Sequence, residues 1–118
     1  PVQRSELKTS QELKVNESLK NSCYWLVMQG DGNLVVYGKN GTKPLWASNT
    51  GGKGGNRVVM QSDGNLVIYG PSGAVWASNT GGKGGNRLVM QSDGNLVMYG
   101  PSGAIWASRS NIHADAGC

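Results

Sequence analysis

Apolar and polar residues alternate in three matching stretches of the chain. These stretches are QGDGNLVVY, QSDGNLVIY and QSDGNLVMY, at residues 29–37, 61–69 and 91–99. Alternation with a period of two predicts a β-strand that has one polar and one apolar face. One aliphatic residue interrupts the polar face of each stretch, and in the second stretch it is Val67. The pattern therefore predicts strands and leaves the place of this valine to be explained.

The three stretches belong to a longer internal repeat. Residues 48–77 and 78–107 differ at three of 30 positions, and a looser copy covers about residues 19–47. A repeat of this length is typical of a protein built from similar small units. We expect a single domain over residues 1–118, in which N-terminal strands and a C-terminal tail complete the three repeats.

The SDGN sequence between two β-rich runs predicts a hairpin, and the length of its loop decides which side chains share a face. A two-residue loop, Asp63-Gly64, would mix polar and apolar residues on both faces. A three-residue loop, Ser62-Asp63-Gly64, separates them and places Gly64 where a left-handed residue is needed. This register pairs Gln61 with Asn65, Met60 with Leu66, Val59 with Val67, Val58 with Ile68 and Arg57 with Tyr69. We therefore expect each repeat to form a small antiparallel sheet.

Tryptophans mark the centre of the predicted structure. Trp46, Trp76 and Trp106 recur 30 residues apart, and the chain has no Phe to supply large core side chains. Three indoles that converge on a pseudo-threefold axis would form such a core. The alternative is that each tryptophan is an exposed binding residue, but every one of them lies within an apolar strand, which favours the core.

Composition and charge narrow the class of protein further. The 118 residues include 19 Gly and 4 Pro, which favours an all-β chain of short strands and tight turns. No apolar run approaches the roughly 18 residues of a membrane span, so we expect a soluble protein without membrane insertion. The net charge of +4 does not indicate a nucleic-acid partner, because the Gly-rich turns that carry Lys53, Arg57, Lys83 and Arg87 contain no interleaved aromatic residues.

The polar face carries the candidate chemistry. Between Lys20 and Ala114, the only acidic residues are three aspartates, one in the same turn of each repeat. A carboxylate accepts hydrogen bonds, Asn and Gln donate and accept, and Tyr adds a hydroxyl, a combination that suits the vicinal hydroxyls of a sugar. A pyranose also has patches of C–H groups, and an exposed Val67 would pack against one of them. The candidate binding residues are Gln29, Asp31, Asn33, Val35, Tyr37, Gln61, Asp63, Asn65, Val67, Tyr69, Gln91, Asp93, Asn95, Val97 and Tyr99.

A purely structural role is the alternative for part of this face. Asp and Asn side chains stabilise turns through hydrogen bonds to the backbone. Such bonds explain Asp63 and in part Asn65. They do not explain Gln61, Val67 or Tyr69, so we favour a binding face.

Catalytic chemistry has little support in the sequence. The single histidine, His113, lies in the C-terminal tail, no Ser-His-Asp or Cys-His set can be assembled, and the three aspartates belong to separate repeats. The GGKGG turns lack the GK[ST] ending of a phosphate-binding loop. We therefore expect a protein that is not an enzyme and that needs no metal or cofactor.

Two cysteines, Cys23 and Cys118, stand near opposite ends of the repeats. A disulfide within one chain, a disulfide across a dimer and two unrelated thiols are the alternatives, and a disulfide would suit an oxidising compartment. The sequons Asn16-Glu17-Ser18 and Asn40-Gly41-Thr42 are compatible with secretion. We expect a secreted, extracellular protein.

The motif Q-x-D-x-N-x-V-x-Y, intact in all three repeats, resembles the mannose-binding motif of the monocot bulb-type lectins, the family of the snowdrop agglutinin. The resemblance covers about residues 6–110, including Leu7, Leu13 and Leu19, whose spacing of six suits the leading strands of that family. It implies a β-prism II fold, with three four-stranded antiparallel sheets arranged in pseudo-threefold symmetry around the tryptophan core.

The resemblance also implies a function. Each site would bind α-D-mannose, with Asp and Asn at the axial O2, Gln at O3, Tyr at O4 and Val against the ring carbons. We expect a non-catalytic lectin for mannose and mannose-rich glycans or glycoproteins, acting in defence or cell agglutination. The alternative is a structural, storage or bacterial-killing protein that keeps the fold without depending on sugar.

The assembly and the disulfides follow the family less closely. Its members commonly form dimers by exchanging C-terminal strands, so we expect a homodimer in which Cys118 would lock the exchange. Many members carry cysteines where Gly32, Gly64 and Gly94 stand here, and those cysteines close a local disulfide. That disulfide cannot form in this chain.

Overall fold

The computed structural model describes residues 4–114. Within this range the strands form three four-stranded antiparallel sheets, and a short 3₁₀ helix, η1 (Ser110–His113), follows the last strand. The first sheet contains β3 (Ser18–Asn21), β4 (Tyr24–Met28), β5 (Leu34–Gly38) and β6 (Lys43–Ala47). The second contains β2 (Glu12–Lys14), β7 (Arg57–Met60), β8 (Leu66–Gly70) and β9 (Gly73–Ala77). The third contains β1 (Glu6–Lys8), β10 (Arg87–Met90), β11 (Leu96–Gly100) and β12 (Gly103–Ala107). No helix among these residues is long and apolar enough to cross a membrane.

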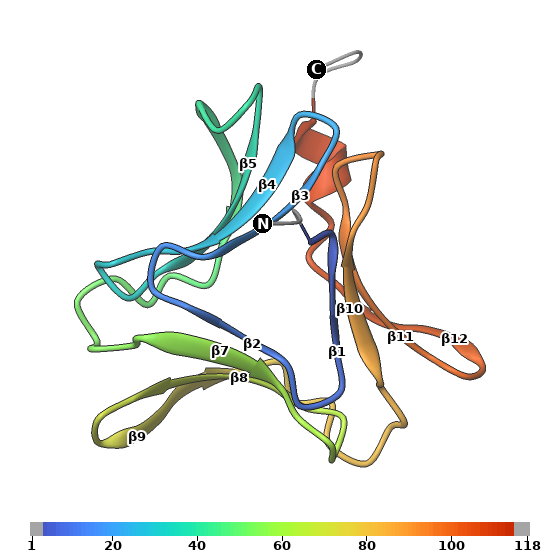
Figure 1. Cartoon of the computed structure of the whole chain (residues 1–118). Helices are drawn as coiled ribbons and strands as arrows, with labels where there is room; N and C mark the ends of the chain where they lie inside the picture. The colour runs from blue at the N-terminus through green and yellow to red at the C-terminus, as the bar shows by residue number, and fades with distance from the viewer. Residues whose placement is uncertain (1–3, 115–118) are drawn as a thin grey trace.

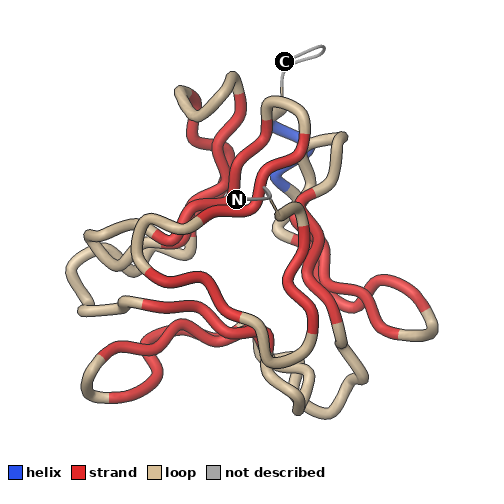
Figure 2. Tube along the Cα trace, in the orientation of Figure 1, coloured by secondary structure: helices blue, strands red, loops and turns tan. Residues whose placement is uncertain are grey.

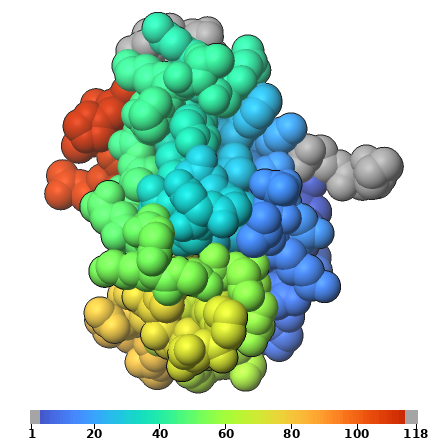
Figure 3. Space-filling view, turned by 90° about the vertical axis from the view of Figure 1, so that its left-hand side faces the viewer, coloured from blue at the N-terminus to red at the C-terminus, as the bar shows by residue number. Residues whose placement is uncertain are grey.

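The three sheets lie around a shared centre as the sides of a triangular prism (Figures 1 and 2). The N-terminal segment, blue in Figure 1, passes all three sheets and adds one edge strand to each. It does so in reverse order, because β1 joins the strands of the third repeat and β3 joins those of the first. From the side, the first repeat, light blue to blue-green, and the second, green to yellow, form one continuous surface (Figure 3). The predicted all-β prism of three four-stranded sheets is therefore confirmed.

The leading strands are short because the sequence supplies one buried residue to each. Leu7, Leu13 and Leu19 are completely buried at the centres of β1, β2 and β3. The connections turn through Ser10 and Asn16, which have φ angles of 71° and 70°. Asn adopts this left-handed region more readily than most residues. Each turn directs the chain to the next sheet and does not fold it back into a hairpin. The spacing of six thus gives three residues to β1, to β2 and to each connection, while β3 continues for a fourth residue.

The hairpins adopt the predicted three-residue loop. The amide N–H of Gln61 donates to the carbonyl of Asn65 at 2.9 Å, and Gly64 closes the turn with a φ of 91°. The five residue pairs predicted for β7 and β8 are confirmed, four of them as strand partners and the first by this hydrogen bond. A feature that the pattern did not predict is a shift of register between Ile68 and Tyr69, where β8 meets β9. The shift recurs at the matching place in all three sheets.

The tryptophans converge as predicted, but they are not the most buried part of the core. Trp46, Trp76 and Trp106 contact one another edge to face, with ring centroids 5.7 to 6.1 Å apart. All three are only partly buried, whereas the completely buried side chains of the core are leucines, methionines and β-branched residues of the leading and inner strands. An indole is rarely covered completely because of its size, and each of these lies on an edge strand. The indoles therefore close the core rather than form its centre.

Candidate carbohydrate-binding sites

Each candidate site lies on the outward face of one hairpin. In the second repeat, Leu66 and Ile68 point into the core with no exposed surface, so Val67 and Tyr69 point outward from β8. Gln61 directly follows β7, and the turn places the aspartate and the asparagine between the strands. The structure thus brings together the five predicted residues of each repeat. We call these groups the first, second and third sites, in residues 29–37, 61–69 and 91–99.

The aspartate of each site combines a turn bond with an open carboxylate. Asp63 Oδ1 accepts the backbone N–H of Asn65 at 2.9 Å, and Gln61 Nε2 donates to both carboxylate oxygens at 3.1 and 3.2 Å. The bond from the Asn65 backbone, and then the one from Gln61, lower the pKa of the Asp63 carboxyl below its usual value. Asp63 is exposed and, when ionised, has lone pairs left for further donors. The turn-stabilising alternative is therefore correct for one oxygen, without excluding a ligand at the other.

The asparagine is more committed to the fold than the sequence suggested. Asn65 Oδ1 accepts hydrogen bonds from Ser78 Oγ at 3.1 Å and from the backbone N–H of Thr80 at 3.2 Å. Asn33 is held in the same way, whereas Asn95 Oδ1 accepts from Ser108 Oγ at 3.5 Å and from the backbone N–H of Arg109 at 3.0 Å. Because the oxygen is engaged, only the Nδ2 group is available to a ligand. The asparagine was predicted to donate and accept hydrogen bonds with a ligand, but in the folded chain its side chain can only donate.

The Ser and Thr residues that hold this asparagine were missed at the level of sequence. Thr80 Oγ1 bonds to Ser78 Oγ at 2.8 Å and donates to the carbonyl of Gly64 in the site turn at 2.7 Å. A Ser-x-Ser sequence, Ser108 to Ser110, replaces the Ser-x-Thr sequence beside the third site and makes the same contacts. The signal was present, because the sequence W-A-S is followed by such a hydroxyl residue in every repeat.

Gln and Tyr form the other end of each site, and the first site differs from the others. In the second and third sites, the tyrosine hydroxyl donates to the glutamine Oε1, as Tyr69 does to Gln61. In the first site the amide is turned, and Gln29 Nε2 donates to the Tyr37 hydroxyl at 2.6 Å. The hydroxyl hydrogen of Tyr37 is then available to a ligand, whereas Tyr69 and Tyr99 offer lone pairs.

The valine faces outward as predicted, but it is not exposed. Val35, Val67 and Val97 are only 3 to 4% exposed, although they lie outside the hydrophobic core cluster. Val67 stands on an inner strand between Val59 and Ala77, and larger side chains flank it along β8. The expectation of an exposed apolar contact is therefore wrong in extent, because these neighbours cover most of the side chain. Val67 forms the floor of the site, so a sugar would contact only its outermost atoms.

Comparison with known proteins places these sites in a family. No family model matches the chain. A solved structure described as a monomeric monocot mannose-binding lectin from Gastrodia elata is 45% identical, superposes with a TM-score of 0.81, and the match covers 89% of this chain and 96% of that one. The chain belongs to the monocot mannose-binding lectin family.

Other relatives agree with this assignment. The agglutinin from snowdrop (Galanthus nivalis) bulbs, solved in complex with methyl-α-D-mannoside, is 42% identical over 89% of this chain and 95% of its own, with a TM-score of 0.75. A mannose-specific lectin of Narcissus pseudonarcissus is 48% identical over 46 residues, which are 39% of this chain. The match spans only 40% of the length of this curated relative.

In this lectin, the residues beside the first site differ from those beside the second and third sites. The Arg57 guanidinium lies 4.8 Å from the centre of the Tyr69 ring and pairs with Glu12 at 3.1 Å. Arg87 lies in the same way over Tyr99 and pairs with Glu6 at 3.7 Å. In the first site Trp25 takes the place of the arginine as the strand partner of Tyr37, with the ammonium of Lys20 4.1 Å from its ring centre. These flanks were not predicted as part of any site.

The remaining expectations concern metals, catalysis and cysteines. Among residues 4–114, no group of three or more His, Cys, Asp or Glu side chains is arranged to hold a metal ion. His113 is exposed on η1. Cys23 is 5% exposed, but Cys118 lies outside the described residues, so the pairing of the two remains a prediction.

Proposed function

We propose that the protein is a non-catalytic lectin that binds α-D-mannose and mannose-rich glycans through its three sites. The observation that carries the proposal is the threefold recurrence of an exposed carboxylate, an amide donor and a Gln–Tyr pair on one outward face. The relatives support it, since the snowdrop agglutinin was solved with methyl-α-D-mannoside and the Polygonatum cyrtonema lectin with monomannoside.

The side chains have complementary tasks in this proposal. The open oxygen of the aspartate accepts from a sugar hydroxyl, and the asparagine Nδ2 donates to the same axial O2. The Gln–Tyr pair serves O3 and O4, while the valine floor contacts the C–H face of the ring. Each neutral hydrogen bond contributes about 0.5 to 1.5 kcal/mol net, so one site binds weakly and several sites together give avidity.

A glycan array read with and without excess mannose tests the proposal. Signals on mannose-terminated glycans that free mannose removes are expected. An array without mannose-dependent signals would overturn the proposal and would favour a structural, storage or bacterial-killing role on the same fold.

We further propose a secreted agglutinin that acts as a homodimer. Both sequon asparagines, Asn16 and Asn40, lie exposed in turns with positive φ, where glycosylation is sterically open. The Gastrodia elata relative is described as monomeric, so the assembly of this chain has to be measured separately. Analytical ultracentrifugation is expected to give a dimer mass, and a monomer mass at agglutinating concentrations would contradict this part of the proposal.

A further inference from the structure

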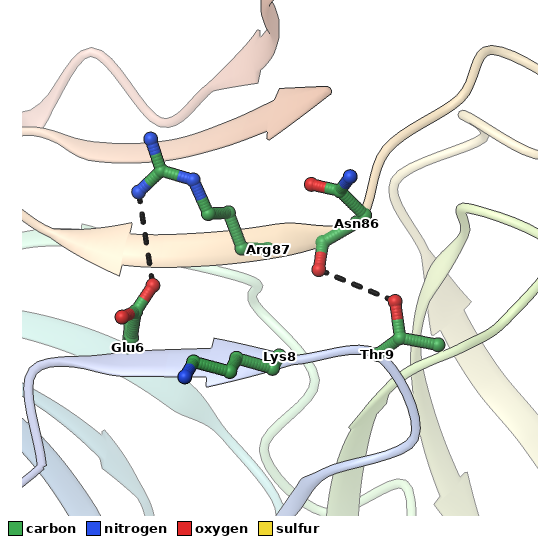
Figure 4. A pocket seen from close by; sticks show the side chains of 5 residues that line it. All are labelled: Glu6, Lys8, Thr9, Asn86 and Arg87. Atoms are coloured by element: carbon green, nitrogen blue, oxygen red, sulfur yellow. Dashed lines mark hydrogen bonds and ion pairs between the residues drawn. The ribbon is translucent and has the colours of Figure 1, made fainter. Parts of the chain in front are cut away.

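An open cavity of about 540 Å³ lies beside the third site, and polar and charged residues line it. Its lining comes from β1, from β10 and from the turns at their ends (Figure 4). The lining residues are Glu6, Lys8, Thr9, Asn86 and Arg87. Small-molecule sites commonly have volumes of about 300 to 1,000 Å³, so the cavity has room for a sugar ring.

The cavity and the third site share one face of the third sheet. Leu7 and Leu88 point into the core, so Lys8 and Arg87, which are strand partners, point outward together. Arg87 is also the strand partner of Tyr99 and covers its ring. Neighbouring strands are about 4.8 Å apart, so a path from Tyr99 over Arg87 to Lys8 crosses roughly 10 Å of sheet. Arg87 therefore borders both the third site and the cavity.

The lining mixes donors and acceptors in the way that sugar hydroxyls require. Glu6 accepts, Lys8 and Arg87 donate, and the side chain of Asn86 can do both. The Glu6–Arg87 pair is loose, with 3.7 Å between its nearest atoms and 35% and 48% of the side chains exposed. In the described part of the chain, no ion pair engages the ammonium of Lys8. These groups can turn toward a ligand without breaking a buried contact.

An acidic ligand fits this lining less well than a neutral one. An anion could pair with the Lys8 ammonium, but the Glu6 carboxylate in the same lining would repel it. The hydroxyls of a neutral sugar can instead accept from Lys8 and Arg87 and donate to Glu6. The first site lacks both the acidic residue and the arginine. Ser18 stands where the other sheets have Glu6 and Glu12, and Trp25 stands where they have an arginine. The flanks of the first and third sites therefore differ where the second ring of a glycan would lie.

We infer that this cavity is a subsite for a second, neutral sugar residue, so that the third site recognises a disaccharide unit of a mannose-rich glycan. The inference rests on the proposed function of the third site. Such a subsite would make the third site selective for the linkage between two sugar residues, while the first site would bind a single mannose. Each added hydrogen bond corresponds to a roughly two- to tenfold gain in affinity.

The test uses chains with one working site. Asp31→Asn with Asp63→Asn leaves the third site, and Asp63→Asn with Asp93→Asn leaves the first. Calorimetry with methyl α-mannoside and with α(1→2)-, α(1→3)- and α(1→6)-mannobiose then measures what the second ring contributes. In the third-site chain, at least one mannobiose is expected to bind about fivefold or more tightly than the monosaccharide.

Variants of the lining separate the subsite from the primary site. Lys8→Met removes the ammonium and keeps the aliphatic stem, and Glu6→Gln removes the charged acceptor. Both should reduce the disaccharide gain to less than about twofold, with methyl α-mannoside affinity unchanged for Lys8→Met. Lys14→Met is the matched control, because Lys14 holds the same position in the second sheet as Lys8 in the third, and it should leave the gain intact.

Three results would overturn the inference. One is the absence of a disaccharide gain in the third-site chain, and another is an equal gain in the first-site chain or in Lys8→Met. The third is a stronger gain from a disaccharide with an acidic second residue that increases in Glu6→Gln, because Glu6 would then be a competitor. If neither single-site chain binds methyl α-mannoside, the proposed function itself fails, and the inference fails with it.

Discussion

Replacement of a single motif aspartate should silence one site and leave the other two working. Asp63→Asn keeps the size of the side chain and an oxygen that can accept the Asn65 N–H at 2.9 Å, so the turn should survive. The substitution replaces the second oxygen by an NH₂ group. This group would face Gln61 Nε2, which lies 3.1 and 3.2 Å from the two carboxylate oxygens, and two donors would then oppose each other.

The expected loss follows from the chemistry of the remaining lone pairs. A sugar hydroxyl that donates to a carboxylate forms a charge-assisted bond, about twice as strong as one to a neutral amide oxygen. Loss of such a bond should weaken mannose binding at the second site roughly tenfold or more. The first and third sites use their own aspartates on other sheets, so their affinities should not change.

Isothermal titration calorimetry with methyl α-mannoside measures this directly. The stoichiometry should fall from three sites per chain to two in Asp63→Asn, and Asp31→Asn, Asp63→Asn and Asp93→Asn combined should give a folded chain without measurable binding. Ser62→Ala is the control, because Ser62 is exposed in the same turn and the first repeat carries Gly30 at this position. Normal mannose binding by the folded triple variant would remove the carboxylates from the mechanism and refute the reasoning.

Further substitutions and conditions test the rest of the site. Val67→Thr should weaken the second site and lower the free energy of unfolding by about 1 kcal/mol, because Val67 is 3% exposed and the added hydroxyl would be desolvated; a loss of stability with normal binding at this site would place the valine outside it. Thr80→Val should destabilise the chain by about 1 to 3 kcal/mol in urea unfolding, since the carbonyl of Gly64 would lose its 2.7 Å bond, and an unchanged midpoint would contradict that assignment. The hydrogen bonds that lower the pKa of Asp63 keep it ionised, so binding by a chain with only the second site should be as strong at pH 4.5 as at pH 7 and be lost only below the ordinary value of 3.8; loss that begins near pH 5 would show that another group controls binding. Mannose binding should survive EDTA, and loss that calcium restores would show that the sites are not metal-free.

The depressed pKa of Asp63 also fixes the sign of its effect on stability. The folded-state pKa lies below the value of the unfolded chain, so the stabilising contribution is complete above the unfolded pKa. It is lost as the pH falls through the folded pKa. Acid should therefore lower both the free energy of unfolding and the affinity of the second site for sugar.

Much of the fold could be predicted because its information is local. The alternation in 61–69 and the chemistry of the Ser62-Asp63-Gly64 turn were enough to predict the register of β7 against β8, which the structure confirms. Each repeat forms the same hairpin from its own local sequence. The side chains that point outward follow from the period of two along a strand. The five residues predicted for each site could be placed on one face for the same reason, since they lie within nine positions of one another.

The tertiary structure decided what depends on contacts between distant residues. The pairing of β1 with β10 joins Leu7 to Leu88, and no local pattern states which sheet receives which leading strand. The exposure of Val67 depends on neighbours in β7 and β9, and the acceptor of Asn65 is occupied by groups 13 and 15 positions away. Side-chain periodicity and turn preferences act over a few residues, so they determine the units and the rows of side chains. Burial and shared hydrogen bonds arise only when the units meet, so only the tertiary structure shows which atoms of a site are still free to bind.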